Sequence, residues 1–144
     1  MKARLTLYIF LATITTFIFS SCNQRGCTDS SALNWDVLAT VNDGSCYYSN
    51  VIFYTSLLGV NGVPIARIDV AINGESIGFI PGGFFYPAGP TNCSGPATLS
   101  YQFKDGRRVN WNAVITLNNG FQFFTSGTVQ PSRFEECIRV NVIR

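Results

Sequence analysis

Apolar and polar side chains alternate along the chain between residues 67 and 80. Every second residue from Ile68 to Ile72 is apolar, and Asn73-Gly74 separates this run from a second one. A period of two is typical of a strand with one buried face, and Asn-Gly between two such runs is the strongest short hairpin signal. The pattern therefore predicts an antiparallel hairpin in this segment.

The same alternation returns further along the chain. Asp105-Gly106 turns the chain from one alternating segment into a return strand, and Asn119-Gly120 makes another turn. The segments with this pattern are 99–103, 109–117, 121–125 and 138–142. No stretch has sustained apolar residues at helical spacing. About seven short strands after Val51 predict an all-β fold, an antiparallel β-sandwich over 51–144.

A loop with aromatic side chains interrupts the strands at 81–93. Its proline and glycine content disfavours a central strand. Phe84, Phe85 and Tyr86 lie in this loop, where they either form an exposed patch or fold over the open edge of the sandwich. We take them, with Trp35, as candidate ligand-binding residues.

The amino-terminal segment 1–21 carries an export signal. It is first basic, then apolar over 5–19, then small, and it ends directly before Cys22. The apolar run has the length of a signal-peptide core and is shorter than a comfortable membrane span of about 20 residues. Phe19-Ser20-Ser21-Cys22 resembles the lipobox of bacterial lipoproteins, in which the cysteine thiol takes a diacylglycerol. The resemblance implies that 1–21 is a signal peptide and that Cys22 is lipidated.

Lipidation of Cys22 predicts where the protein resides. Each acyl chain contributes about 0.8 kcal/mol per buried methylene, so two or more chains hold a protein on a membrane without a transmembrane helix. We expect an outer-membrane lipid anchor, on the periplasmic face or the cell surface, followed by a polar tether over 22–26. The membrane is then the first predicted partner.

A disulfide-bounded loop module is expected at 27–50. Cys27 and Cys46 enclose a stretch with too few apolar side chains to build its own core. A disulfide between them contributes about 3 kcal/mol by loop entropy, and an exported protein meets conditions in which the bond persists.

Two sets of residues match patterns of known proteins. The first set comprises Cys27-Thr28-Asp29, Ala32, Asn34-Trp35, Ala39-Thr40 and Asp43-Gly44-Ser45-Cys46, and it resembles a short module of exported proteins of Bacteroidetes-type bacteria. The second resembles their small β-sandwich repeats, which are transthyretin-like or immunoglobulin-like in outline, and comprises 68–78, Cys93, Tyr101, Asp105-Gly106, Trp111 and Cys137. The resemblance implies an exported lipoprotein in which this module precedes a β-sandwich domain of unknown function.

The chain contains five cysteines. With Cys22 assigned to lipid, the other four allow three pairings. We favour Cys27–Cys46 and Cys93–Cys137, because each pair lies within one expected module. The second bond ties the aromatic loop to the last strand and contributes about 4 kcal/mol by loop entropy.

Four side chains of the module offer oxygen ligands for calcium: Asp29, Asp36, Asn42 and Asp43. Their spacing differs from that of an EF-hand, which needs carboxylates at alternating positions and a terminal bidentate glutamate. Asp and Asn also bond their own backbone in turns, and we favour that interpretation, with calcium binding as the alternative. No other cofactor is expected.

Composition removes several classes of function. The chain has no histidine, so it lacks Ser-His-Asp and Cys-His relays and histidine-ligated zinc. Only 12% of residues are charged, and removal of residues 1–21 takes Lys2 and Arg4 away and leaves the remainder formally neutral. We therefore expect neither catalysis nor a nucleic-acid partner.

The sequence as a whole predicts a lipid-anchored cell-envelope protein with a non-catalytic binding or structural role. One alternative is a carbohydrate-binding accessory lipoprotein of a surface uptake system, with Trp35, Tyr86 or neighbouring aromatics as stacking platforms. A calcium-binding module is another. The expected partner, besides the membrane, is a glycan or another envelope protein.

Overall fold

A computed structural model describes residues 23–143 of the chain. The predicted signal peptide and the lipidation site Cys22 lie outside these residues. Every regular element between Asn23 and Ile143 is a β-strand, so the fold is all-β as the alternation predicted. The strands are β1 (Arg25–Gly26), β2 (Val41–Asn42), β3 (Asn50–Tyr54), β4 (Gly59–Val60), β5 (Val63–Ile72), β6 (Glu75–Pro81), β7 (Leu99–Gln102), β8 (Val109–Leu117), β9 (Gln122–Val129) and β10 (Cys137–Asn141).

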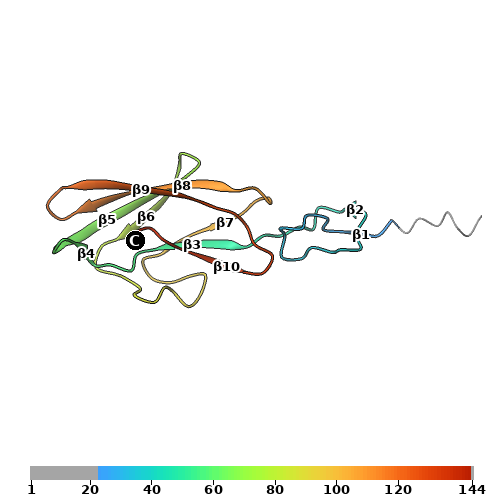
Figure 1. The fold of residues 1–144 in the computed structure, drawn as a ribbon, viewed down its shortest axis with the longest axis horizontal. Coiled ribbons are helices and arrows are strands. Elements are labelled where there is room, and N and C mark those ends of the chain that lie inside the picture. The colour runs from blue at the N-terminus through green and yellow to red at the C-terminus, as the bar shows by residue number, and fades with distance from the viewer. Residues whose placement is uncertain (1–22, 144) are drawn as a thin grey trace, which may run out of the picture.

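Two sheets form a β-sandwich (Figure 1). One sheet has the order β4-β5-β8-β9, and the other has the order β10-β3-β7. β6 also belongs to the first sheet, because it pairs with β5 over Arg67–Ile72, whereas β4 pairs with β5 at Val63 and Pro64. The edges of this larger sheet are therefore β9 on one side and β4 with β6 on the other.

The predicted hairpin over 67–80 is confirmed as β5 and β6. Asn73 and Gly74 connect the two strands with φ angles of 51° and 85°, the positive values that a type I′ hairpin turn requires. A register shift between Val70 and Ala71 interrupts the pairing. The alternation sets which face is buried, since Ile68, Val70 and Ile72 all point into the core.

Two pairings differ from the sequence predictions. β7 and β8 do not form a hairpin around Asp105-Gly106, because β7 pairs with β3 and β8 pairs with β5 and β9. The turn carries the chain from one sheet to the other. The sandwich is also not wholly antiparallel, since β3 and β10 pair in parallel from Asn50↔Cys137 onward. The long connection between these two strands allows it, because parallel neighbours cannot share a tight turn.

The core lies between the two sheets. Along β8, every second side chain from Val109 to Leu117 is buried, and β3 contributes the fully buried Val51, Ile52 and Phe53. The rings of Phe53 and Trp111 meet edge to face, with centroids 5.8 Å apart. This contact joins the smaller sheet to the larger one.

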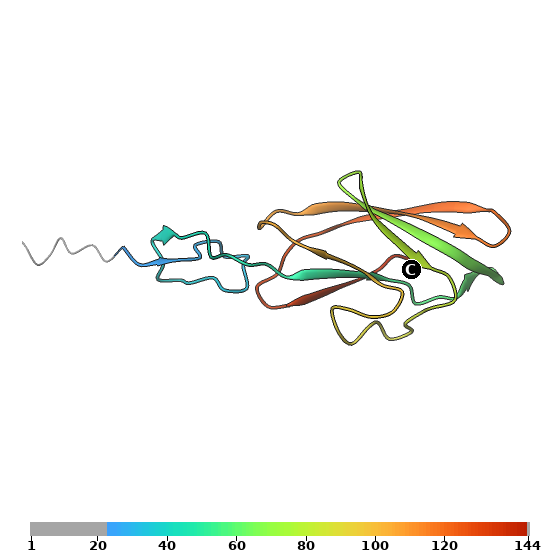
Figure 2. The same cartoon turned by 180° about the vertical axis from the view of Figure 1, so that it is seen from behind.

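The amino-terminal module extends from one end of the sandwich, along its long axis (Figures 1 and 2). β1 and β2, a short parallel pair, lie at the far end of the module. Cys27, Ala32 and Tyr48 are buried and belong to the same hydrophobic cluster as the sandwich core. The module is therefore packed onto the end of the sandwich rather than only tethered to it.

Candidate functional site

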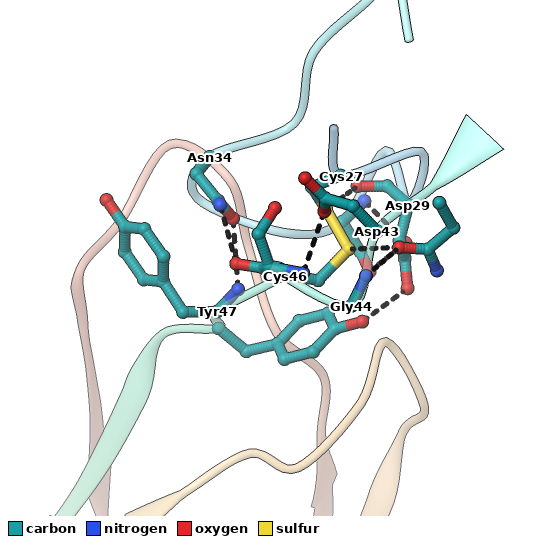
Figure 3. The surroundings of a disulfide bond; sticks show 11 residues. Cys27, Asp29, Asn34, Asp43, Gly44, Cys46 and Tyr47 are labelled. Atoms are coloured by element: carbon teal, nitrogen blue, oxygen red, sulfur yellow. Dashed lines mark hydrogen bonds between the residues drawn. A yellow bond between two sulfur atoms is a disulfide. The ribbon is translucent and has the colours of Figure 1, made fainter. Parts of the chain in front are cut away.

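A disulfide between Cys27 and Cys46 closes the module, as predicted (Figure 3). The two Cα atoms are 4.8 Å apart. Asn34 lies across the loop from Cys46: its Nδ2 donates to the carbonyl of Ser45, and its Oδ1 accepts from the amide of Tyr47. The Asn34 amide thus bonds two backbone groups on the other side of the loop, and these bonds help to hold the loop in one shape.

The four candidate calcium ligands each bond nearby groups of the module. Asp36 and Asp43 accept hydrogen bonds from the amides of Leu38 and Ser45 at 2.9 Å. Asn42 accepts from the amide of Gly44, and Asp29 accepts from the amide of Ser31. No three His, Cys, Asp or Glu side chains within residues 23–143 gather as a metal-binding group. These contacts support the turn-capping interpretation.

Asp29, Ser31 and Tyr48 form a hydrogen-bonded group where the module meets the sandwich, and we call this group the joint. The Tyr48 hydroxyl donates to Asp29 at 2.8 Å, and the Ser31 hydroxyl donates to Asp29 at 2.6 Å. Gly106 lies against this group, because a Cβ there would come within 2.6 Å of the Asp29 carboxylate. The Asp105-Gly106 turn, whose pattern indicated only a change of direction, therefore also supports the module.

Asp29 and Tyr48, the two partners of one hydrogen bond in the joint, both have shifted pKa values. The hydrogen bonds from Ser31 and Tyr48 lower the pKa of Asp29. Burial, and then the hydrogen bond to Asp29, raise the pKa of Tyr48 to about 12. Both shifts favour one proton arrangement, a protonated Tyr48 beside an ionised Asp29.

Tyr48 is expected to make stability depend on alkaline pH. Its folded-state pKa lies above the ordinary value of 10.0, so its contribution is complete below that pH and is lost as the pH rises through about 12. The Tyr48→Phe variant should lose less stability over this interval than the parent chain. Urea unfolding followed by tryptophan fluorescence measures the slope. Tyr47→Phe is the matched control, because Tyr47 is exposed. A parental slope in Tyr48→Phe contradicts the prediction.

The four candidate aromatic residues lie in two different parts of the molecule. Trp35 belongs to the module, and the Arg133 guanidinium stacks over its ring at 4.7 Å. Tyr86 is held in the 81–98 loop by a hydrogen bond from its hydroxyl to the carbonyl of Pro96. Phe84 and Phe85 are half exposed. Of the four candidates, only Phe84 and Phe85 lack a stacked or hydrogen-bonded partner among the described contacts.

The second predicted disulfide, Cys93–Cys137, fastens the same loop to β10. Arg139 adds two hydrogen bonds from its guanidinium to the carbonyls of Pro90 and Thr91. Cys137 and Arg139 lie on the same face of β10, opposite to the buried Val140. The loop therefore packs on the outer face of the smaller sheet, while the edge of β10 faces the cleft beside β9.

A cleft that the sequence did not indicate lies between β9 and β10. Its volume is about 530 Å³, and Trp111, Gly127, Val140 and Val142 contribute to its lining. A Cβ at Gly127 would lie 2.9 Å from the Trp111 indole nitrogen, so only glycine lets β9 lie this close to the indole, which is 9% exposed. The signal in the sequence was a lone glycine within an alternating strand, which marks a close approach.

A second hollow, of about 620 Å³, adjoins the turn at Asn73 and Gly74. Exposed side chains of β8 and β9 line it: Asn110, Asn112, Ser126 and Thr128. All of these side chains carry neutral amide or hydroxyl groups, and we call this surface the neutral hollow. Such a surface can exchange hydrogen bonds with a neutral polar ligand.

Comparison with known proteins does not identify a relative. No protein-family model matches the chain, and neither curated proteins nor solved structures give a significant match.

No helix between Asn23 and Ile143 is long and apolar enough to cross a membrane.

Proposed function

We propose that this chain is a lipid-anchored protein of the cell envelope, held on the outer membrane, with a non-catalytic binding or structural role. The observation that carries the proposal is the position of β1, which begins at Arg25, three residues after Cys22. β1 lies at the end of the module that points away from the sandwich (Figure 1). A lipid on Cys22 would leave the sandwich exposed to solvent. The disulfide-closed module would then set the distance between the sandwich and the membrane.

The end of the module near Asn23 has apolar side chains that suit a membrane surface. Val37 and Leu38 are 71% and 65% exposed, and they occupy a turn that contacts Gln24 through Asp36. The backbone carbonyl of Gln24 also accepts hydrogen bonds from Thr40 and Val41. Gln24 is two positions from Cys22 along the chain, so an acyl anchor there brings Val37 and Leu38 near the bilayer interface.

The titration behaviour of the chain also supports a non-catalytic role. The carboxylates with a lowered pKa, Asp29 and Asp43, owe the shift to hydrogen bonds from Ser31 and Ser45 in their own turns. Tyr48 belongs to the joint with the sandwich. None of the three lines the cleft or the neutral hollow, where a general acid or base would be needed.

Lipidation is tested by metabolic labelling with palmitate. We expect the parent chain to incorporate label and to fractionate with membranes, and Cys22→Ser to lose both properties. Asn23→Ala is the matched control, because it changes the adjacent residue and keeps the thiol. Palmitate incorporation that survives Cys22→Ser would overturn the proposed anchor.

Glycan binding is the alternative that a specific observation favours. The neutral hollow offers Asn112, Ser126 and Thr128 as hydrogen-bonding groups, and Phe84 and Phe85 offer separate exposed rings. Saturable binding to a polysaccharide, abolished by Asn112→Ala or by Phe84→Ala, would favour this function. A broad glycan panel without any binding would dispose of it.

A further inference from the structure

Most edges of the two sheets are protected against pairing with another chain. β6 contains Pro81, which has no amide hydrogen, and its Gly78 approaches the side chain of Leu99. β7 has only 4 residues. β10 has only 5 residues, one of which is the charged Arg139. Proline, short length and charge are usual means of protecting an edge.

β9 has none of these protections. It spans 8 residues, Gln122–Val129, without charge or proline, and its register with β8 runs unbroken from Thr116↔Gln122 to Val109↔Val129. Among the described strands, only β8 pairs with it. Its ring at Phe124 is 73% exposed. An uncharged and regular edge of this length is a template for an additional strand.

The free backbone groups of β9 can be assigned from its turn. Leu117 donates its amide hydrogen to the carbonyl of Phe121 at 2.9 Å. Hydrogen-bonded pairs alternate along an antiparallel ladder, so the odd-numbered residues of β9 bond to β8. The backbone groups that point outward therefore belong to Gln122, Phe124, Ser126 and Thr128. They offer four donors and four acceptors to an incoming strand.

The cleft beside β9 gives the incoming strand a place for side chains. Thr125, Gly127 and Val142 line the cleft together with Trp111, whose mostly buried indole lies against Gly127. The inward side chains of Phe123 and Thr125 are partly buried. A strand added at this edge directs every second side chain toward the cleft, where an apolar group would cover the indole.

We propose that the outer edge of β9 binds an extended, uncharged segment of another polypeptide, which adds to the larger sheet as a strand and places an apolar side chain over Trp111. The absence of charge on β9 matches an uncharged partner. A second copy is the less suitable occupant, for a reason that rests on the proposed anchor. Two identical edges pair antiparallel, and β9 runs along the long axis of the molecule (Figure 1). Such a dimer would direct its two modules, and hence its two anchors, in opposite directions.

Panning of a displayed library of random octapeptides tests this proposal. The chain is used as residues 22–144 with Cys22→Ser and is held by a biotin at its amino terminus, so the result is independent of lipidation. We expect enrichment of uncharged peptides with alternating apolar residues. Synthetic copies of these peptides should bind about tenfold more weakly to Ser126→Pro, which loses an outward amide, and to Phe124→Lys, which charges the edge.

Asn112→Lys is the matched control, because it adds the same charge to the same sheet one strand away from the edge. It should bind the peptides as the parent chain does. Equal binding to all variants, or no enrichment at all, would overturn the proposal. A dimer in sedimentation velocity that Phe124→Lys dissociates would overturn it too, because a second copy would then occupy the edge.

Discussion

Replacing Cys93 and Cys137 together with alanine is expected to lower the free energy of unfolding by about 4 kcal/mol. The bond closes a loop with a sequence separation of 44, and removing it returns conformational entropy to the unfolded chain. The same substitution releases the loop that covers β10, although the two hydrogen bonds from Arg139 remain available. Guanidinium unfolding of the parent and the double variant measures the difference.

The corresponding double variant at Cys27 and Cys46 is the control for this prediction. Its sequence separation is 19, so the same relation gives a smaller loss of about 3 kcal/mol. If the shorter loop proves the more stabilising, loop entropy is not what governs the effect, and strain or residual structure in the unfolded chain must dominate.

Local features of the fold could be predicted from the sequence. The hairpin β5–β6 follows from alternation and from an Asn-Gly turn, and both signals lie within a few adjacent residues. The burial of β8 follows from the same alternation. Both disulfides were predicted because each pair of cysteines lies within one stretch of the chain.

Pairings between distant segments could not be predicted in this way. β3 and β10 meet in parallel although Val51 and Ile138 are far apart along the chain. The turn at Asp105-Gly106 is compatible with a hairpin and with a crossing between sheets, since a turn signal fixes a change of direction but not a partner. The choice depends on which sheet buries the apolar face of β7.

The candidate site was equally difficult to predict. Exposed aromatics were sought in a proline-rich loop, and the structure keeps Phe84 and Phe85 accessible there. The cleft lies instead between β9 and β10, where Gly127 lets β9 lie against Trp111. Alternation placed Trp111 in the core, and a lone glycine in a strand marks a close approach, but a single sequence does not indicate that β9 and β10 face each other across a cleft.

Replacing Phe53 with alanine is expected to have the largest effect of a single substitution, a loss of about 3–5 kcal/mol. Its side chain is fully buried, and its ring packs edge to face on Trp111. Deleting the ring removes buried apolar area and leaves a cavity between sheets that are held together by such contacts. Urea unfolding followed by tryptophan fluorescence measures the loss.

Phe124→Ala provides the matched control, because it deletes the same ring from a position that is 73% exposed. It should change the free energy of unfolding by no more than about 0.5 kcal/mol. A large loss at Phe124 would mean that its ring is already covered in solution, and the outer edge of β9 would then be occupied by a second copy. A small loss at Phe53 would mean that the smaller sheet contributes little to the core. The two substitutions together therefore distinguish the ring that holds the sandwich closed from the ring that is free to meet a partner.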